Sequence, residues 1–185
     1  MSQQNFYANY LQVLQAITHC EENNLLTPAL VMLYSAIDSV SWLACTTTKE
    51  SGKAFKVWVT DWMLKDPRIK CTAEELYAAR CGLVHTLTPT SSLTQRGIRK
   101  IAYSWGTASN QRLEELIDSV GAANELVPVH LSDIIEVFRT GMADYLEYVA
   151  EDPQRLDAFK EKCREHFATV SMDRVDEALS LLSVQ

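Results

Sequence analysis

The sequence lacks the short motifs that mark several common classes of enzyme. It contains no glycine-rich phosphate loop, no G-x-S-x-G nucleophile elbow and no H-E-x-x-H zinc motif. No Cys or His pair has the spacing of a zinc site, so we expect neither a metal ion nor another cofactor. The five cysteines include no C-x-x-C pair, and their odd number leaves one unpaired in any complete disulfide scheme. We therefore expect reduced thiols.

The chain also lacks the features of a secreted or membrane-bound protein. Residues 1–6 have no basic start followed by an apolar run, which a secretory signal requires. The most apolar stretch, residues 29–45, is shorter than a membrane span and contains Asp38. We interpret it as a core helix and expect a cytoplasmic protein. With 185 residues, 47% of them hydrophobic and 22% charged, the chain can form one domain with its own core, and disordered and fibrous classes are excluded.

Basic residues are scarce outside the middle of the chain. Residues 1–48 contain three acids and no Lys or Arg, and residues 101–185 contain sixteen acids against seven basic residues. Residues 49–100 contain ten basic residues against five acids, although the net charge of the chain is −7. This pattern fits either ordinary uneven solvated faces or a basic middle segment that meets an anion, and the sequence leaves both open.

Apolar residues recur at helical spacing along most of the chain. The predicted helices cover about residues 5–22, 28–45, 73–86, 133–150, 153–167 and 171–182, with another amphipathic helix around residues 55–63. Thr27 and Pro28 are expected to start the second helix, and Thr72 with Glu75 forms a capping-box pattern at residue 72. We therefore predict a mainly α fold, a single helical domain over residues 1–185 arranged as an up-and-down bundle.

Two segments interrupt the helical pattern. Residues 98–105 and 126–131 are rich in aromatic and β-branched side chains, which favour strands. A short helix is predicted between them at residues 110–120, ending at Gly121. We expect the two segments to pair as a short β-hairpin.

The fourth predicted helix carries the residues most suited to chemistry. Its end reads Arg80-Cys81-Gly82-Leu83-Val84-His85, which places an arginine five residues before a histidine. Such spacing occurs often by chance, so its context must support it. In the structural alternative, His85 interacts with the helix end and Arg80 pairs with Glu74 or Glu75 on the surface.

In that context the chain resembles the HEPN superfamily, the higher eukaryotes and prokaryotes nucleotide-binding helical domains, whose mark is Arg, four to six residues, then His. The resemblance covers residues 5–150, includes the apolar second helix at residues 30–39, and leaves residues 151–185 as additional C-terminal helices. It implies a metal-independent ribonuclease of a toxin–antitoxin or defence system, acting as a homodimer with one Arg–His set from each subunit and an antitoxin as a further partner. Cys81 departs from the family pattern, in which a polar residue often follows the arginine.

Carried over from that resemblance, the reaction is transesterification within RNA. His85 is expected to act as general base or acid on the ribose 2′-hydroxyl or the leaving 5′-oxygen, and Arg80 to stabilise the phosphoryl charge. Five residues turn a helix through about 140° beyond a full circle, so the spacing favours a site shared between two copies over a single-chain site. The alternative is a catalytically inactive helical module that binds a protein partner or a nucleotide through the same cleft.

Several other residues are candidates for supporting roles. Asp38 lies within the apolar second helix and needs a partner, which is either the Arg80–His85 pair or a buried Tyr, Trp or backbone amide. Tyr34, one turn earlier, either joins the same polar patch or belongs to the core. Cys81 provides only a weak hydrogen-bonding group beside the arginine. Gly82 would allow close approach of either a phosphate or a neighbouring backbone.

A mixture of basic and aromatic residues in and just before the first predicted strand suits contact with single-stranded RNA. These residues are Arg96, Arg99, Lys100, Tyr103 and Trp105. The aromatic residues are few and no RNA-binding fingerprint is present, so we favour the structural alternative, a hairpin packed on the helices.

Overall fold

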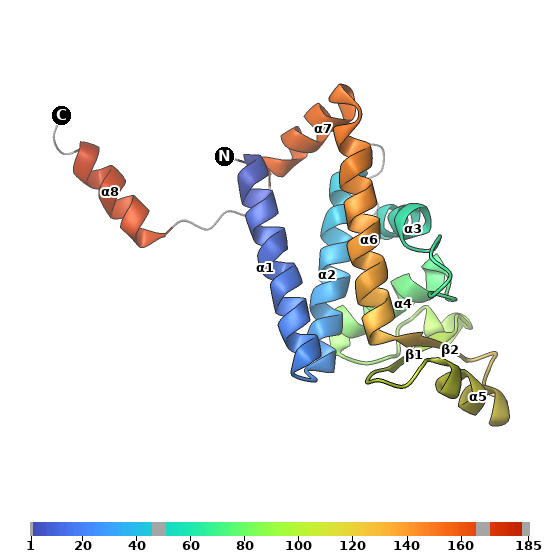
Figure 1. Cartoon of the computed structure of the whole chain (residues 1–185). Helices are drawn as coiled ribbons and strands as arrows, with labels where there is room; N and C mark the ends of the chain where they lie inside the picture. The colour runs from blue at the N-terminus through green and yellow to red at the C-terminus, as the bar shows by residue number, and fades with distance from the viewer. Residues whose placement is uncertain (1, 46–50, 166–170, 183–185) are drawn as a thin grey trace.

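The computed structural model describes residues 2–45, 51–165 and 171–182, and these residues form a mainly α fold, as predicted (Figure 1). The helices are α1 (Ser2–Glu22), α2 (Leu26–Ala44), α3 (Ser51–Trp62), α4 (Ala73–Thr86), α5 (Gln111–Ser119), α6 (Leu131–Ala150), α7 (Pro153–Cys163) and α8 (Met172–Leu182). A 3₁₀ turn, η1 (Thr94–Arg96), precedes strand β1 (Lys100–Ser104), and strand β2 (Leu126–His130) precedes α6.

Helix α2 is the centre of the bundle. It packs against α1, α3, α4, α6 and α7, and residues on most of its sides are buried, including Leu33, Ile37 and Val40. By length and composition it is the one helix of the described chain that could cross a membrane, yet half of its apolar stretch is buried inside the protein. Its apolar character is therefore explained by its place in the core.

Local signals decide where the helices begin. Thr72 and Glu75 form the predicted capping box at α4, since the Glu75 amide donates to the Thr72 hydroxyl and the Thr72 amide donates to the Glu75 carboxylate. The predicted Thr27 cap of α2 is wrong, because α2 begins at Leu26, two residues before the predicted start, and its N-cap residue Leu25 makes no side-chain cap. Pro28 still lies in the first turn, where a missing N–H costs no hydrogen bond.

The predicted β-hairpin is also wrong. Strands β1 and β2 do pair, but they run parallel, with Ile101 opposite Val127 and Tyr103 opposite Val129. Helix α5 lies in the connection between them, so the chain returns to the starting end of β1 before β2 begins (Figure 1). A crossover of this kind joins parallel strands, whereas a hairpin requires a short turn.

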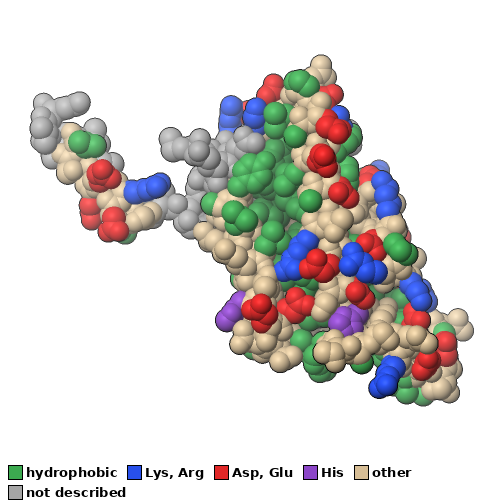
Figure 2. All heavy atoms as spheres, viewed as in Figure 1, with side chains coloured by type: hydrophobic (Ala, Val, Ile, Leu, Met, Phe, Trp, Pro, Cys, Tyr) green, Lys and Arg blue, Asp and Glu red, His purple; other side chains and the backbone are tan. Residues whose placement is uncertain are grey.

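One face of the molecule carries both signs of charge in close proximity (Figure 2). On the face shown in Figure 2, acidic and basic side chains are intermingled rather than gathered into separate patches.

Helix α8 lies apart from the other helices in Figure 1, and none of its described residues belongs to the hydrophobic core. The candidate site lies where α4 packs against α2, within the bundle.

Candidate functional site

Arg80 and Asp38 are brought together by the packing of α4 against α2. The Arg80 Nε donates to Asp38 Oδ2 over 2.5 Å, and the two side chains are 18% and 23% exposed. A charge-assisted bond at this depth fixes the guanidinium more firmly than a fully exposed pair would. Of the two partners predicted for Asp38, the structure therefore provides the arginine.

Arg80 also reaches His85 along the surface of its own helix. The Arg80 Nη1 lies 3.0 Å from His85 Nε2. A guanidinium can only donate, so Nε2 is the acceptor in this geometry and the ring proton is on Nδ1. Although the two positions do not lie on one stripe of the helix, the contact forms within one chain, because the long arginine side chain spans the angle between them.

Burial and the neighbouring charges act in opposite directions on the pKa values of Asp38 and Arg80. Burial raises the pKa of Asp38 above its ordinary value, although the hydrogen bond and charge of Arg80 and the charge of His85 pull it down. For Arg80, burial lowers the pKa, but the hydrogen bond and charge of Asp38 outweigh it and the pKa is raised. Arg80 is therefore a permanent cation at the centre of the site.

Cys81 and Tyr77 complete the polar surroundings of Arg80. The side chain of Cys81 lies beside the Tyr77 hydroxyl and the Arg80 guanidinium, and it raises the pKa of both groups. Burial raises the pKa of Tyr77, with the neighbouring Cys81 adding to the effect. Tyr77 was not a candidate in the sequence, although its position one turn before Cys81 places the two on one helix face. The Cys81 thiol therefore has polar neighbours.

The chain that follows α4 folds back against the last turn of this helix, at Gly82. A Cβ on Gly82 would lie 2.4 Å from the Thr88 carbonyl oxygen, so only glycine allows this approach. The Thr86 hydroxyl donates to the Gly82 carbonyl and shares a hydrogen bond with the Thr88 hydroxyl. Of the two roles considered for Gly82, the structure provides the approach of a neighbouring backbone.

The acidic partners suggested by the structural alternative are occupied elsewhere. Glu75 is 5% exposed, caps α4 and accepts from Arg99 Nε over 2.6 Å. Glu74 pairs with Lys56 at 3.3 Å. The Leu87 amide, rather than His85, satisfies carbonyls at the end of α4. Arg80 and His85 therefore form a pair of their own with Asp38.

No protein-family model, curated protein or solved structure matches this chain. Its candidate site must therefore be judged on its own geometry and chemistry. Within the described residues, no group of three or more His, Cys, Asp or Glu side chains could hold a metal ion. The chemistry available at the site is that of one cation, one carboxylate and one imidazole, which suits proton transfer beside an anionic group.

Tyr34 lies outside this polar cluster. It is fully buried, and its hydroxyl shares a hydrogen bond with the Tyr103 hydroxyl on β1. Burial raises the pKa of Tyr34 well above its ordinary value, and the neighbouring Tyr103 adds to the effect. Tyr34 therefore belongs to the core, the second of its two predicted roles.

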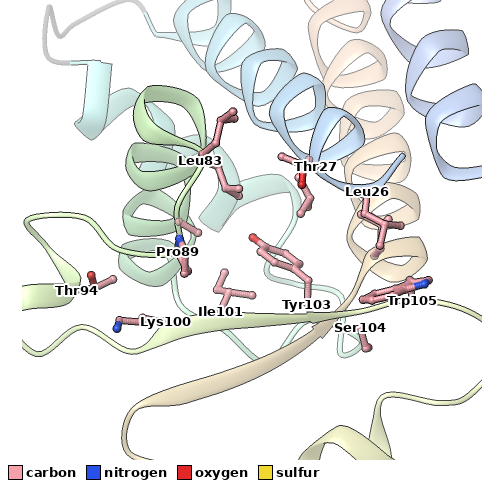
Figure 3. Close-up of a pocket in the computed structure, with 14 residues that line it drawn as sticks. Leu26, Thr27, Leu83, Pro89, Thr94, Lys100, Ile101, Tyr103, Ser104 and Trp105 are labelled. Carbon is pink, nitrogen blue, oxygen red and sulfur yellow. The ribbon is translucent and has the colours of Figure 1, made fainter. Parts of the chain in front are cut away.

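The basic and aromatic residues around β1 do not share one surface. Arg99 is bound to Glu75, Arg96 is exposed in η1, and Tyr103 turns inward to Tyr34. Lys100, Tyr103 and Trp105 instead line a cavity between β1 and the helices above it (Figure 3). The structure thus brings together three of the residues considered for RNA contact, but around a pocket.

Proposed function

We propose that this protein is a metal-independent endoribonuclease of the HEPN type, acting in a toxin–antitoxin or defence system. The observation that carries the proposal is the contact of the Arg80 guanidinium with both Asp38 and His85. A positioned cation beside a neutral imidazole provides the two groups that RNA transesterification needs, charge stabilisation and proton transfer.

For RNA to bind at this site, a phosphate group has to replace His85 as a hydrogen-bond partner of Arg80. A phosphodiester competes for the guanidinium, because its oxygens are charged acceptors and the imidazole nitrogen is neutral. When Nη1 turns to the phosphate, His85 Nε2 becomes free to accept a proton. Asp38 retains Nε throughout, so the guanidinium pivots about a fixed point.

The proposed reaction uses His85 and Arg80 of one subunit, together with a proton donor that is either the second subunit or water. His85 Nε2 takes the proton of the ribose 2′-hydroxyl, the O2′–P bond forms and the P–O5′ bond breaks. The departing 5′-oxygen takes a proton from the imidazolium of the second subunit or from water, leaving a 2′,3′-cyclic phosphate and a 5′-hydroxyl. Arg80 stabilises the negative charge that develops on the phosphoryl oxygens.

The experiment is cleavage of a mixed RNA pool by the purified protein in the presence of a chelator, with the product ends identified. We expect His85→Ala and Arg80→Met each to reduce cleavage by about 100-fold or more. Exposed residues away from the site supply matched controls, His19→Ala and Arg112→Ala, which should cleave like the unaltered protein. Cleavage that persists at full rate in both site variants would refute the proposal.

A second candidate function rests on the same contact. Because Arg80 occupies His85 Nε2, the pair is closed in the unbound chain, as suits an inactive module that binds a protein partner or a nucleotide through this surface. Such a module would cleave no RNA with or without the site residues, yet would lose its partner in Arg80→Met. In either case we propose a cytoplasmic homodimer, with an antitoxin protein as a further partner of the active form.

A further inference from the structure

A cavity of about 370 Å³ lies between β1, the first turns of α2 and the end of α4. Its volume falls in the range of small-molecule sites. Figure 3 shows β1 as its floor and the two helices as its roof, with Leu83 on α4 and Leu26 and Thr27 on α2. The Arg80–His85 pair does not line it.

The walls of this cavity are mostly apolar and firmly held. Leu30, Ile101 and Leu131 contribute buried aliphatic side chains from three different elements. The orientation of the Tyr103 ring is fixed, because its hydroxyl shares a hydrogen bond with the hydroxyl of the buried Tyr34. A ligand would therefore meet a preformed apolar surface, which lowers the cost of ordering on binding.

Leu87, which lines the cavity and ends α4, has a backbone conformation that is costly for a leucine. It has a φ of 55°, in the left-handed region that disfavours a branched side chain and favours glycine. Its side chain is also 64% exposed, so its burial does little to offset the strain. The left-handed conformation serves to end α4, but it does not require a leucine; contact with a bound molecule would explain why an exposed apolar side chain stands there beside an apolar cavity.

The two ends of the cavity differ in chemistry. Trp105, 57% exposed, lies at one end beside Leu26, and Lys100 lies with Thr94 at the other (Figure 3). Within the described chain, no side chain pairs with the ammonium group of Lys100, whereas the neighbouring Arg99 is bound to Glu75. Lys100 is therefore available to an anion at the polar end.

We propose that this cavity binds a small amphipathic carboxylate. Its hydrocarbon body lies between α2, α4 and β1, where it covers Leu87 and Trp105, and its carboxylate lies at the Lys100 end. The apolar walls supply most of the affinity, and the lysine distinguishes an acid from an uncharged molecule of the same length. This site is separate from the proposed ribonuclease centre.

The test compares octanoate with octan-1-ol by calorimetric titration of the full-length protein. The two probes share their hydrocarbon body, so we expect octanoate to bind about tenfold more tightly if Lys100 meets the carboxylate. Lys100→Met should remove that difference, while Lys160→Met, a surface lysine on α7, should retain it. Equal affinities for the two probes in the unaltered protein would overturn the proposal.

A second variant separates loss of the site from loss of the fold. Leu87→Gly relieves the left-handed strain, so its thermal midpoint should equal or exceed that of the unaltered protein, while octanoate affinity falls about tenfold. Unchanged affinity in this variant would also overturn the proposal. Arg80→Met should bind octanoate normally whatever its effect on RNA cleavage, so this proposal and the ribonuclease proposal can fail independently.

Discussion

Arg80 makes two contacts through different nitrogens of one guanidinium. The Nε is held by Asp38 and Nη1 by His85, so one part of the group can remain anchored while the other moves. Two effects act in opposite directions on the pKa of Asp38, because burial favours the neutral carboxyl group and Arg80 favours the charged form. The ionisation of Asp38 is therefore a direct measure of how strongly the arginine is held.

We expect Arg80→Met to raise the pKa of Asp38 further. In the unaltered protein that pKa already exceeds the ordinary value of 3.8, and the variant loses the attraction that lowers it while much of the burial remains. The measurement is an NMR titration of the Asp38 carboxyl carbon in both proteins. A downward shift in the variant would show that the pair does not form in solution.

The raised pKa of Asp38 also determines how the free energy of unfolding depends on pH. Because Asp38 has a higher pKa in the folded than in the unfolded chain, it contributes stability that is complete below the unfolded value. That contribution is lost as the pH rises through the folded value. Asp38→Asn, which cannot ionise, should therefore lack this component of the pH dependence when unfolding is followed between pH 3 and pH 7.

Which residues form the candidate site could be anticipated, but not how they touch. The polar Asp38 inside an apolar helix and the Arg80–His85 spacing are visible in the sequence. Helical angles alone placed Arg80 and His85 apart, because they describe Cβ directions and not the reach of a long side chain. Tyr77 was missed since a tyrosine one turn from a cysteine carries no distinctive pattern.

Among the elements, α4 depends most clearly on its own sequence. Thr72 and Glu75 exchange hydrogen bonds at its first turn, and Glu75 also binds Arg99 beside β1. The same carboxylate thus fixes the start of the helix and its position against the strand. Such local pairing is readable from the sequence, and this part of the prediction was confirmed.

Thr72→Ala should lower the free energy of unfolding by about 1 kcal/mol, because the Glu75 amide loses its acceptor. Thr72→Ser keeps the hydroxyl and should lie close to the unaltered protein. Urea denaturation followed by circular dichroism measures both. Equal stability of the alanine and serine variants would mean that the hydroxyl contributes nothing at this helix start.

The direction of the strands was predicted wrongly. Strand propensity located β1 and β2 to within two residues at each end, but it says nothing of their direction. The helix predicted at residues 110–120 lies between the two strands, and a connection of this length and kind joins parallel strands rather than a hairpin. Pairing was therefore predicted correctly, and the signal for its direction was present in the sequence.

At the scale of the whole molecule, the last helices contribute unequally. In α7, Phe159 and Cys163 are buried, and the Phe159 ring packs edge to face on Phe6 at 5.1 Å. Lys162 donates to the carbonyls of Trp42 and Cys45 at the end of α2. Helix α8 has no such described contacts with the core, and its Leu179 and Leu181 are exposed.

Removing α7 contacts should therefore cost far more than removing α8. We expect Phe159→Ala to lower the free energy of unfolding by about 3–5 kcal/mol, since it opens a cavity in the core. Deletion of residues 171–185 should change it by less than about 0.5 kcal/mol. Both are measured by urea denaturation, and a large loss on deletion would place α8 against the bundle in solution.

The central position of α2 has a consequence for how the protein is made. The helix is complete once residue 44 is synthesised, yet two of the helices that pack against it, α6 and α7, end only at residues 150 and 163. At about 5–20 residues per second, the ribosome needs on the order of ten seconds to add them. During that interval α2, the most apolar helix of the described chain, can be covered only by the earlier helices, so the side that later packs against α6 and α7 stays open to water.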